Sequence, residues 1–192
     1  MESLDIQFSN KNFTISTKKE FYSFFNVHYQ TTLTYKNEKV RNAILQNEPD
    51  LESCFRGMLY QNLLYQMCHP PISIGWISKE IGFGVFAKKP IEKGQIIGMY
   101  TGVVQKVEVG NPYQLAYQLL DDTIYVINAK KRGNFTRFVN HSYTPNLEIE
   151  KVHFEGAFQY LFISSCAIEE GGELTINYGK EYWEKKNQTP RR

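Results

Sequence analysis

Apolar residues recur at helical spacing in the first third of the chain. From Asp50 to Cys68, one face of a predicted helix carries Leu51, Phe55, Met58, Leu59, Leu63 and Met67. Asp50 is expected to cap this helix, and Pro70-Pro71 to end it, because proline lacks a backbone donor. Shorter amphipathic stretches are predicted around Phe21, Phe24, Phe25 and His28 and around Val40, Ala43 and Ile44. Residues 1–70 are therefore predicted to form a small helical segment that covers the next domain.

After Pro71 the pattern changes to short runs of β-branched and aromatic residues, separated by glycines and charged turns such as IEKGQ and IEEGGE. The runs are ISIGWIS, GFGVFA, QIIGMYTGVV, DTIYVINA, FQYLFISSCAI and ELTINYG. Such runs are typical of short strands. One weak helical stretch is predicted at Tyr113 to Leu120. The chain is therefore predicted to be α+β and mostly β, with residues 71–179 as the main domain and residues 180–192 as a short tail.

Composition agrees with a folded domain. The chain has 192 residues, of which 42% are apolar and 15% aromatic, enough to bury roughly 70% of the unfolded surface. Its net charge of +2 gives no reason to expect direct nucleic-acid binding. The start MESLDIQFSN lacks the features of a signal peptide, and no apolar run approaches a membrane span of about 20 residues.

The three cysteines, Cys54, Cys68 and Cys166, are too few and too widely spaced for a disulfide framework or a zinc cluster. We therefore expect a soluble intracellular protein, with nucleus, cytoplasm and export as an effector all open. A Cys166–His141 nucleophile is disfavoured because Cys166 lies in an apolar strand, where a buried inert thiol is common. The run GFGVFA is no dinucleotide fingerprint, because the third glycine and the helix are missing.

The run RFVNHSYTPN, Arg137 to Asn146, places many hydrogen-bonding side chains next to a buried segment, and an aromatic tail, LTINYGKEYW, follows later. With GFGVFA and IEKGQIIGMYTGVV, these blocks resemble, in order, those of the SET domain of protein-lysine methyltransferases. The resemblance covers roughly Ile72 to Trp183. It implies a SET fold of several short-stranded sheets with a knot-like C-terminal crossing, and S-adenosyl-L-methionine as cofactor.

The resemblance also implies roles for individual residues. Phe83, Gly84 and Val85 would offer backbone groups to the methionine part of the cofactor. Asn140 and His141 would hold its amino-acid and adenine parts, with Arg137 supporting their loop. Tyr178 would be the active-site hydroxyl, and Tyr100 would line the lysine channel opposite it. The polar run would then be the floor of a cofactor pocket.

Some positions depart from the family pattern. Tyr143 stands where many relatives have a zinc-binding cysteine, and residues 179–192 contain no cysteine, so no metal is expected. Trp183 is a candidate lid over the adenine, with core packing as the alternative. Gly172 replaces a usual glutamate at a turn. Ile149 and Ile176 replace aromatic residues that limit the degree of methylation in some relatives, which predicts room for more than one methyl group.

The leading hypothesis is a methyltransferase acting on a histone tail or another basic protein, such as a ribosomal protein. An inactive SET-type module that binds cofactor or peptide is the alternative. Asp121, Asp122, Glu148 and Glu150 are candidate rims of a groove for a basic peptide, although ordinary solvated carboxylates are the simpler interpretation. The N-terminal helices are a candidate homodimer interface, with Phe24, Phe25 and Leu63 in one face.

Overall fold

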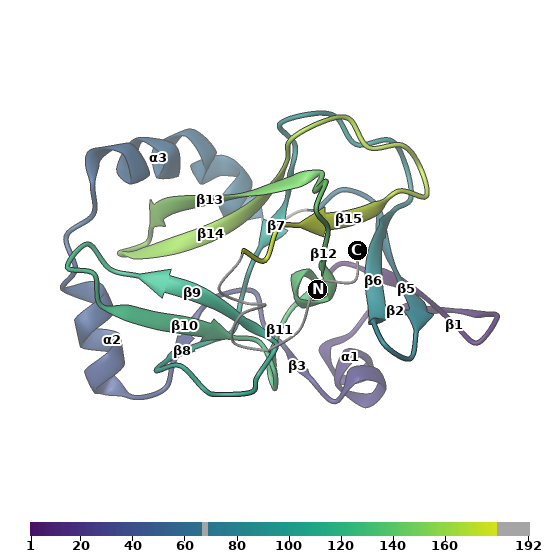
Figure 1. Cartoon of the computed structure of the whole chain (residues 1–192), viewed down its shortest axis with the longest axis horizontal. Coiled ribbons are helices and arrows are strands. Elements are labelled where there is room, and N and C mark those ends of the chain that lie inside the picture. The colour runs from purple at the N-terminus through teal and green to yellow at the C-terminus, as the bar shows by residue number, and fades with distance from the viewer. Residues whose placement is uncertain (67–68, 180–192) are drawn as a thin grey trace.

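The computed structural model describes residues 1–66 and 69–179, which form four sheets and three α-helices (Figure 1). The largest sheet has six strands. Their order is β12 (Asn140–His141), β15 (Glu173–Ile176), β6 (Gly82–Ala87), β5 (Ile72–Ser78), β1 (Leu4–Phe8) and β2 (Lys11–Ile15). Strand β15 pairs with β6 antiparallel on one side and with β12 parallel on the other, so the last described strand lies inside the sheet.

Three smaller sheets complete the β structure. One has the order β4 (Thr34–Tyr35), β8 (Val103–Gln105), β10 (Ile124–Asn128) and β9 (Gln114–Gln118). Another has the order β13 (Leu147–Phe154), β14 (Ala157–Ser164) and β7 (Ile96–Met99). The last pairs β11 (Arg132–Gly133) with β3 (His28–Tyr29). The strand runs expected after Pro71 are confirmed, and β5 and β6 coincide with ISIGWIS and GFGVFA.

The helices predicted within residues 1–70 are also confirmed. They are α1 (Lys18–Phe25), α2 (Glu38–Leu45) and α3 (Leu51–Gln66). Thr17 and Glu20 form a capping box at α1, and Asn37 accepts a hydrogen bond from the Val40 amide at α2. At α3 the Ser53 amide donates to Asp50 Oδ1 over 2.7 Å, the expected cap. Within the described residues no helix is both long and apolar enough to cross a membrane.

The N-terminal segment contains strands that the helical pattern did not predict. Strand β1 pairs in parallel with β5, and β3 pairs with β11. Leu4, Ile6 and Phe21 are completely buried in the same core cluster as Val85 and Leu174. Residues 1–66 are therefore part of one hydrophobic core with the domain that follows, because their strands extend its sheets.

The helix predicted at Tyr113 to Leu120 is wrong. Residues 114–118 form strand β9, paired with β10 in register from Gln114 to Gln118. Tyr117 and Leu119 are buried while Ala116 and Gln118 are exposed, which is the period of a strand. Pairing with β10 overrides the helical propensity of these residues.

Helix α3 exposes the apolar face that its sequence spacing defines. Its apolar residues Leu51, Phe55, Met58, Leu59 and Leu63 are exposed, whereas Ser53, Gly57 and Leu64 are buried. The buried face packs on β13, and a Cβ atom built at Gly57 would lie 2.9 Å from the His153 carbonyl carbon and closer still to its oxygen. The small residues of α3 therefore allow a close approach to β13, and this approach turns the large residues outward.

We predict that Gly57→Ala destabilises the protein, although alanine favours a helix over glycine by about 1 kcal/mol. The added methyl group meets the backbone of β13, and relieving that overlap costs about 1–3 kcal/mol. Urea unfolding measures the change, and Asn62→Ala on the exposed side of α3 serves as the control. A Gly57→Ala variant more stable than the parent would mean that α3 and β13 do not approach this closely.

Candidate active site

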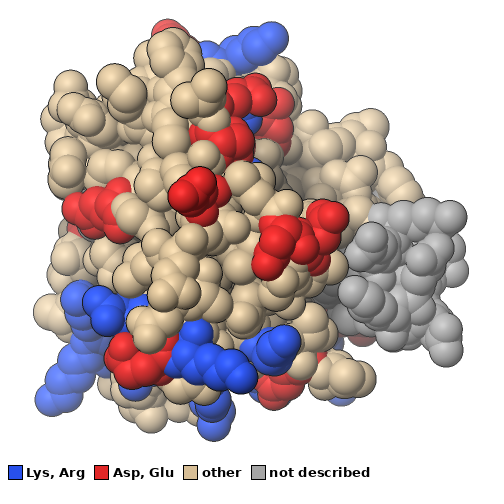
Figure 2. All heavy atoms as spheres, turned by 90° about the vertical axis from the view of Figure 1, so that its left-hand side faces the viewer, with Lys and Arg blue, Asp and Glu red and all other residues tan. Residues whose placement is uncertain are grey.

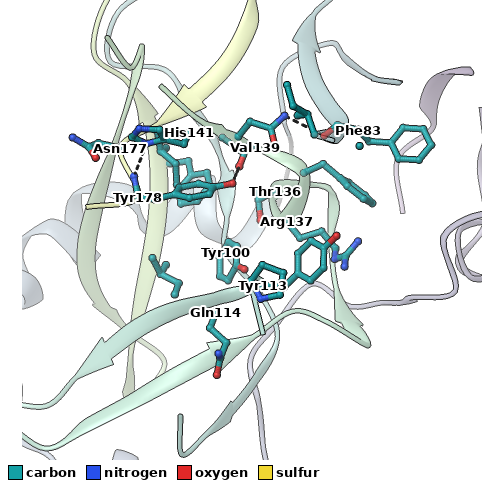
Figure 3. A pocket seen from close by; sticks show the side chains of 18 of the residues that line it. Phe83, Tyr100, Tyr113, Gln114, Thr136, Arg137, Val139, His141, Asn177 and Tyr178 are labelled. Carbon is teal, nitrogen blue, oxygen red and sulfur yellow. Dashed lines mark hydrogen bonds between the residues drawn. The ribbon is translucent and has the colours of Figure 1, made fainter. Parts of the chain in front are cut away.

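A cavity of about 820 Å³ lies where β6, the segment before β12, the end of β15 and the chain entering β9 meet (Figure 3). Its walls include Trp76, Phe83, Tyr100, Tyr113, Gln114, Thr136, Arg137, Val139, Asn140, His141, Ile149, Phe162, Ile176 and Tyr178. Ligand pockets measure roughly 300–1,000 Å³, so the cavity is large enough for a cofactor and part of a second substrate.

The 3₁₀ helix η1 (Phe135–Phe138) leads into the polar run, which then becomes strand β12. Asn134 caps η1, and its side-chain amide also donates to the Met99 carbonyl over 2.9 Å. Asn140 follows η1 and bridges two strands: its Nδ2 donates to the Phe83 carbonyl over 3.1 Å and to Glu173 Oε1 over 2.9 Å. The run is thereby attached to both β6 and β15.

The side chain of Asn146, the last residue of the run, binds main-chain groups of β15. Its Nδ2 donates to the Glu173 carbonyl over 2.8 Å, and its Oδ1 accepts from the Thr175 amide over 2.9 Å. The Ser142 amide adds a bond to the Ile176 carbonyl over 3.0 Å. The polar side chains expected to form only a ligand-binding floor thus also fix the strand that delivers Tyr178.

His141 is buried and aligns Tyr178. Its Nδ1 accepts a hydrogen bond from the Tyr178 amide over 3.1 Å, so the neutral imidazole carries its proton on Nε2. Burial lowers the pKa of His141, and a backbone hydrogen bond with Ile176 partly opposes this change. The neutral ring is therefore the form that fits the fold.

The Tyr178 hydroxyl donates to the Val139 carbonyl over 2.9 Å (Figure 3). Tyr100 is 7% exposed and packs against Phe162 at 5.8 Å between ring centroids. Together with Ile149 and Ile176, these residues line the cavity. This end of the cavity is aromatic and aliphatic, and its polar atoms include the tyrosine hydroxyls and the Val139 carbonyl.

Arg137 is a buried cation in the cavity wall. Its Nε donates to the Ala129 carbonyl over 2.8 Å, and the guanidinium lies 3.9 Å from the centroid of the Tyr113 ring. Burial lowers the pKa of Arg137, and Tyr113 and Tyr100 oppose that change. Among the described residues, no carboxylate forms an ion pair with Arg137. In the described part of the chain, the buried guanidinium is therefore held by main-chain carbonyls and an aromatic ring rather than by a carboxylate.

The cavity brings together Phe83, Tyr100, Arg137, Asn140, His141 and Tyr178. Gly84 and Val85 lie behind Phe83 and are not part of its lining. Val85 is fully buried between Ile74 and Leu174 on the neighbouring strands, and Gly84 is covered by Ile77, Asn140 and Glu173. Trp183, the expected lid, lies outside the described residues.

The aromatic residues of the cavity that the sequence patterns did not indicate include Trp76 and Tyr113. Trp76 is 42% exposed on β5 and packs edge-on against Phe83 at 5.1 Å between ring centroids. Tyr113 was placed in a helix that does not exist. The aromatic content of the strand run ISIGWIS was a usable signal for Trp76, but no pattern indicated which side of β5 faces the cavity.

Cysteine and metal-binding chemistry were also considered in the sequence analysis. Cys166 is exposed just beyond β14, so the expectation of a buried thiol is wrong because the strand ends before it. In residues 1–66 and 69–179, no cluster of three His, Cys, Asp or Glu side chains has the arrangement of a metal site.

A family model described as SET domain matches residues 82–179, just over half of the chain. The match begins at β6 and ends beside Tyr178, so it includes most of the cavity wall. The chain belongs to the SET-domain family. The resemblance seen in the sequence blocks is thereby confirmed.

Curated relatives carry histone-lysine methyltransferase names. The chain is 32% identical over 117 residues to Histone-lysine N-methyltransferase 2D of Homo sapiens, covering 57% of this chain and 2% of that protein. It is 31% identical over 146 residues to Histone-lysine N-methyltransferase NSD3 of Mus musculus, covering 71% of this chain and 10% of that protein. The chain thus spans a small part of these relatives' length.

Solved structures agree on the fold. A crystal structure of ATXR5 in complex with histone H3.1 has a TM-score of 0.64 at 18% identity, covering 85% of this chain and 86% of that chain. A structure of ctPRC2 bound to S-adenosylmethionine has a TM-score of 0.55 at 22% identity, covering 72% of this chain and 19% of that one. These neighbours support the α+β, mostly β SET fold.

We predict a pH effect on stability from His141. Its folded pKa lies below the ordinary value of about 6.5, so the unfolded chain takes up the proton first as the pH falls. The free energy of unfolding should therefore decrease below about pH 6.5 until the pH reaches the folded pKa. Chemical unfolding at pH 7.5 and 5.5 should show a smaller decrease in His141→Gln than in the parent. Exposed His28→Gln is the control, and equal decreases in all three proteins would contradict the assignment.

Proposed function

We propose that this SET domain is an S-adenosyl-L-methionine-dependent protein-lysine N-methyltransferase. The observation that carries the proposal is the convergence of Phe83, Asn140, His141 and Tyr178, from three separate parts of the chain, on one cavity. The methyltransferase names of the relatives support the same activity. The first test is incubation with labelled S-adenosylmethionine and two protein pools, histones and ribosomal proteins, followed by mass spectrometry.

The residues present fit the proposed cofactor. Arg137 supplies positive charge without a carboxylate ion-pair partner in the described part of the chain, which suits an amino-acid carboxylate. Phe83 and Trp76 offer aromatic surface at one side of the cavity, which suits a purine ring. Asn140 and His141 add polar groups to the same lining. When bound, S-adenosylmethionine supplies an electrophilic methyl group on a sulfonium sulfur.

The chain's contribution is to present a lysine amine as a neutral nucleophile. Free lysine has a pKa of about 10.4 and is protonated at neutral pH. The apolar walls formed by Ile149, Phe162 and Ile176 disfavour the ammonium form through desolvation. The amine therefore releases its proton to water more readily inside the channel. Its nitrogen can then form the new N–C bond as the C–S bond breaks.

Tyr178 and Tyr100 would orient that amine. The Tyr178 hydroxyl is fixed by its bond to the Val139 carbonyl, and Val139 itself lines the cavity. A hydroxyl and a carbonyl oxygen side by side can accept hydrogen bonds from the amine and stabilise partial positive charge on the transferred methyl group. Positioning of this kind accounts for much of the acceleration in two-substrate reactions.

We propose a basic peptide, such as a histone tail, as the substrate. The related ATXR5 structure contains histone H3.1, which supports this class. Asp121 and Asp122 lie at the exposed β9–β10 turn, where Thr123 and Gln118 hold them locally. Glu148 and Glu150 flank Ile149 on β13 and do not line the cavity. A groove rimmed by these four carboxylates stays a proposal, and they would act by long-range attraction rather than at the reacting atoms.

We predict that Tyr178→Phe lowers kcat by at least about a hundredfold, comparable to removal of one transition-state hydrogen bond. Binding of S-adenosylmethionine by calorimetry should change only a few-fold. Tyr143→Phe is the matched control, because this exposed ring also packs on His141 and should keep full activity.

Full activity in Tyr178→Phe would remove that hydroxyl from the mechanism. Cofactor uptake by the parent without methyl transfer to either protein pool would instead favour an inactive binding module.

We also predict products carrying more than one methyl group. Ile149 and Ile176 present aliphatic surface to the cavity, so no hydroxyl at these positions restricts rotation of a methylated amine. Intact-mass analysis of a peptide product at long reaction times measures the degree of methylation. Ile176→Tyr should shift the product toward monomethylation by about tenfold. This corresponds to an increase of roughly 1.4 kcal/mol in the activation free energy of the second methyl transfer, because the larger side chain leaves less space. Strictly monomethylated product from the parent would contradict this.

A further inference from the structure

Helix α3 carries the most exposed cluster of large apolar side chains in the described structure. Leu51 is 90% exposed, Met58 71%, Phe55 67%, Leu59 63% and Leu63 52%. These residues, called here the α3 stripe, recur at intervals of three and four positions, so they share one side of the helix. Isolated exposed leucines are ordinary, but a contiguous apolar patch on a soluble domain marks an interaction surface.

The stripe is a fixed surface rather than one side of a loose helix. On the other side of α3, Ser53, Gly57 and Leu64 are buried against β13 and its sheet. Asp50 caps the first turn, and the Tyr65 ring packs against Phe154 at 4.9 Å between centroids. In Figure 1, α3 lies on the outside of the β13–β14 sheet. The helix cannot roll its stripe inward without breaking these contacts.

In the sequence analysis, Phe24, Phe25 and Leu63 were placed in one face, but the structure separates them. Phe24 and Phe25 pack into an aromatic cluster with Phe83, and α1 and α3 lie at opposite corners of Figure 1. Of these two helices, α3 is the one that exposes a row of large apolar side chains.

We propose that the α3 stripe binds the α3 stripe of a second copy of this chain, with the two helices antiparallel. The apolar residues extend from Leu51 in the first turn to Leu63 in the fourth, over a helix about 24 Å long. Both halves of the stripe are apolar, so a reversed copy meets apolar surface along its whole length. A two-fold dimer requires this self-complementarity.

Charge near the stripe favours a like copy over an oppositely charged partner. The stripe itself contains no ionisable side chain. Glu52 pairs with Arg56 within α3, and Asp50 lies 3.8 Å from Lys151 Nζ. The acidic groups gather at the start of the helix, and an antiparallel arrangement keeps those of the two copies apart. Figure 2 shows lysine and arginine gathered along the lower edge of this side of the molecule, below the level of α3.

The area reaches the lower limit of a standard-size interface. From their exposed fractions, the five residues expose on the order of 600 Å² in one copy, so two copies would bury at most about 1,200 Å², against ~1,200–2,000 Å² for standard-size interfaces. Contacts from the rims of α3 would add to that value. Phe55, Met58 and Leu59, at the middle of the helix, would form the interface core.

Sedimentation equilibrium of the full chain between 1 and 100 μM, as rough limits, tests the proposal. The parent should be dimeric at the higher concentrations, and Phe55→Glu/Leu59→Glu should weaken dimerisation at least about a hundredfold. Val109→Glu is the control, because Val109 is 97% exposed and lies outside α3. Circular dichroism verifies folding, and Phe55→Ser/Leu59→Ser replaces the glutamate pair if that variant unfolds.

A parent that is monomeric throughout this range would overturn the proposal. So would a dimer that persists unchanged in the folded α3 variants, because its interface would then lie elsewhere. Neither measurement depends on methyl transfer, so the oligomeric state is decided separately from the proposed activity.

Discussion

The structure depends on the attachment of strand β15 to the polar run that precedes it by some thirty residues. Asn146 satisfies two main-chain groups of β15, Asn140 reaches Glu173, and His141 receives the Tyr178 amide. These groups are largely removed from water, where a lost partner costs about 1–3 kcal/mol each. A short strand of four residues could not be held so firmly by sheet pairing alone, so the side chains of the run specify its position.

The same contacts create the cavity. Holding β15 next to β12 places Tyr178 beside Val139, while η1 brings Arg137 to the opposite wall beneath Tyr113. The two walls differ in character: one is polar and cationic, the other aromatic and aliphatic. The cavity therefore combines polar and apolar surface within one space.

Much of this architecture could be predicted from the sequence, and the elements that were predicted wrongly or missed have physical causes. The ordered blocks from GFGVFA to ELTINYG resemble those of the SET family, and this resemblance indicated the strands and several residues that line the cavity. Tyr113 was misplaced because QLAYQLL consists of good helix formers, and only pairing with β10 decides its structure. Helix α3 was predicted correctly in extent, but its apolar spacing did not show that Ser53, Gly57 and Leu64 form the buried side, since spacing reveals a stripe and not what covers it. Strands β1, β3 and β4 form by long-range pairing with β5, β11 and β8, which local pattern cannot reveal.

The insertion of β15 between β6 and β12 has a consequence for biosynthesis. The six-stranded sheet lacks an interior member until almost the last described residues have left the ribosome, and β6 and β12 cannot close on each other correctly before then. Non-local pairing of this kind slows folding and leaves sheet edges open in the meantime. The cavity can therefore form only after β15 has been synthesised, and until then β6 has a paired neighbour only on the side of β5, β1 and β2.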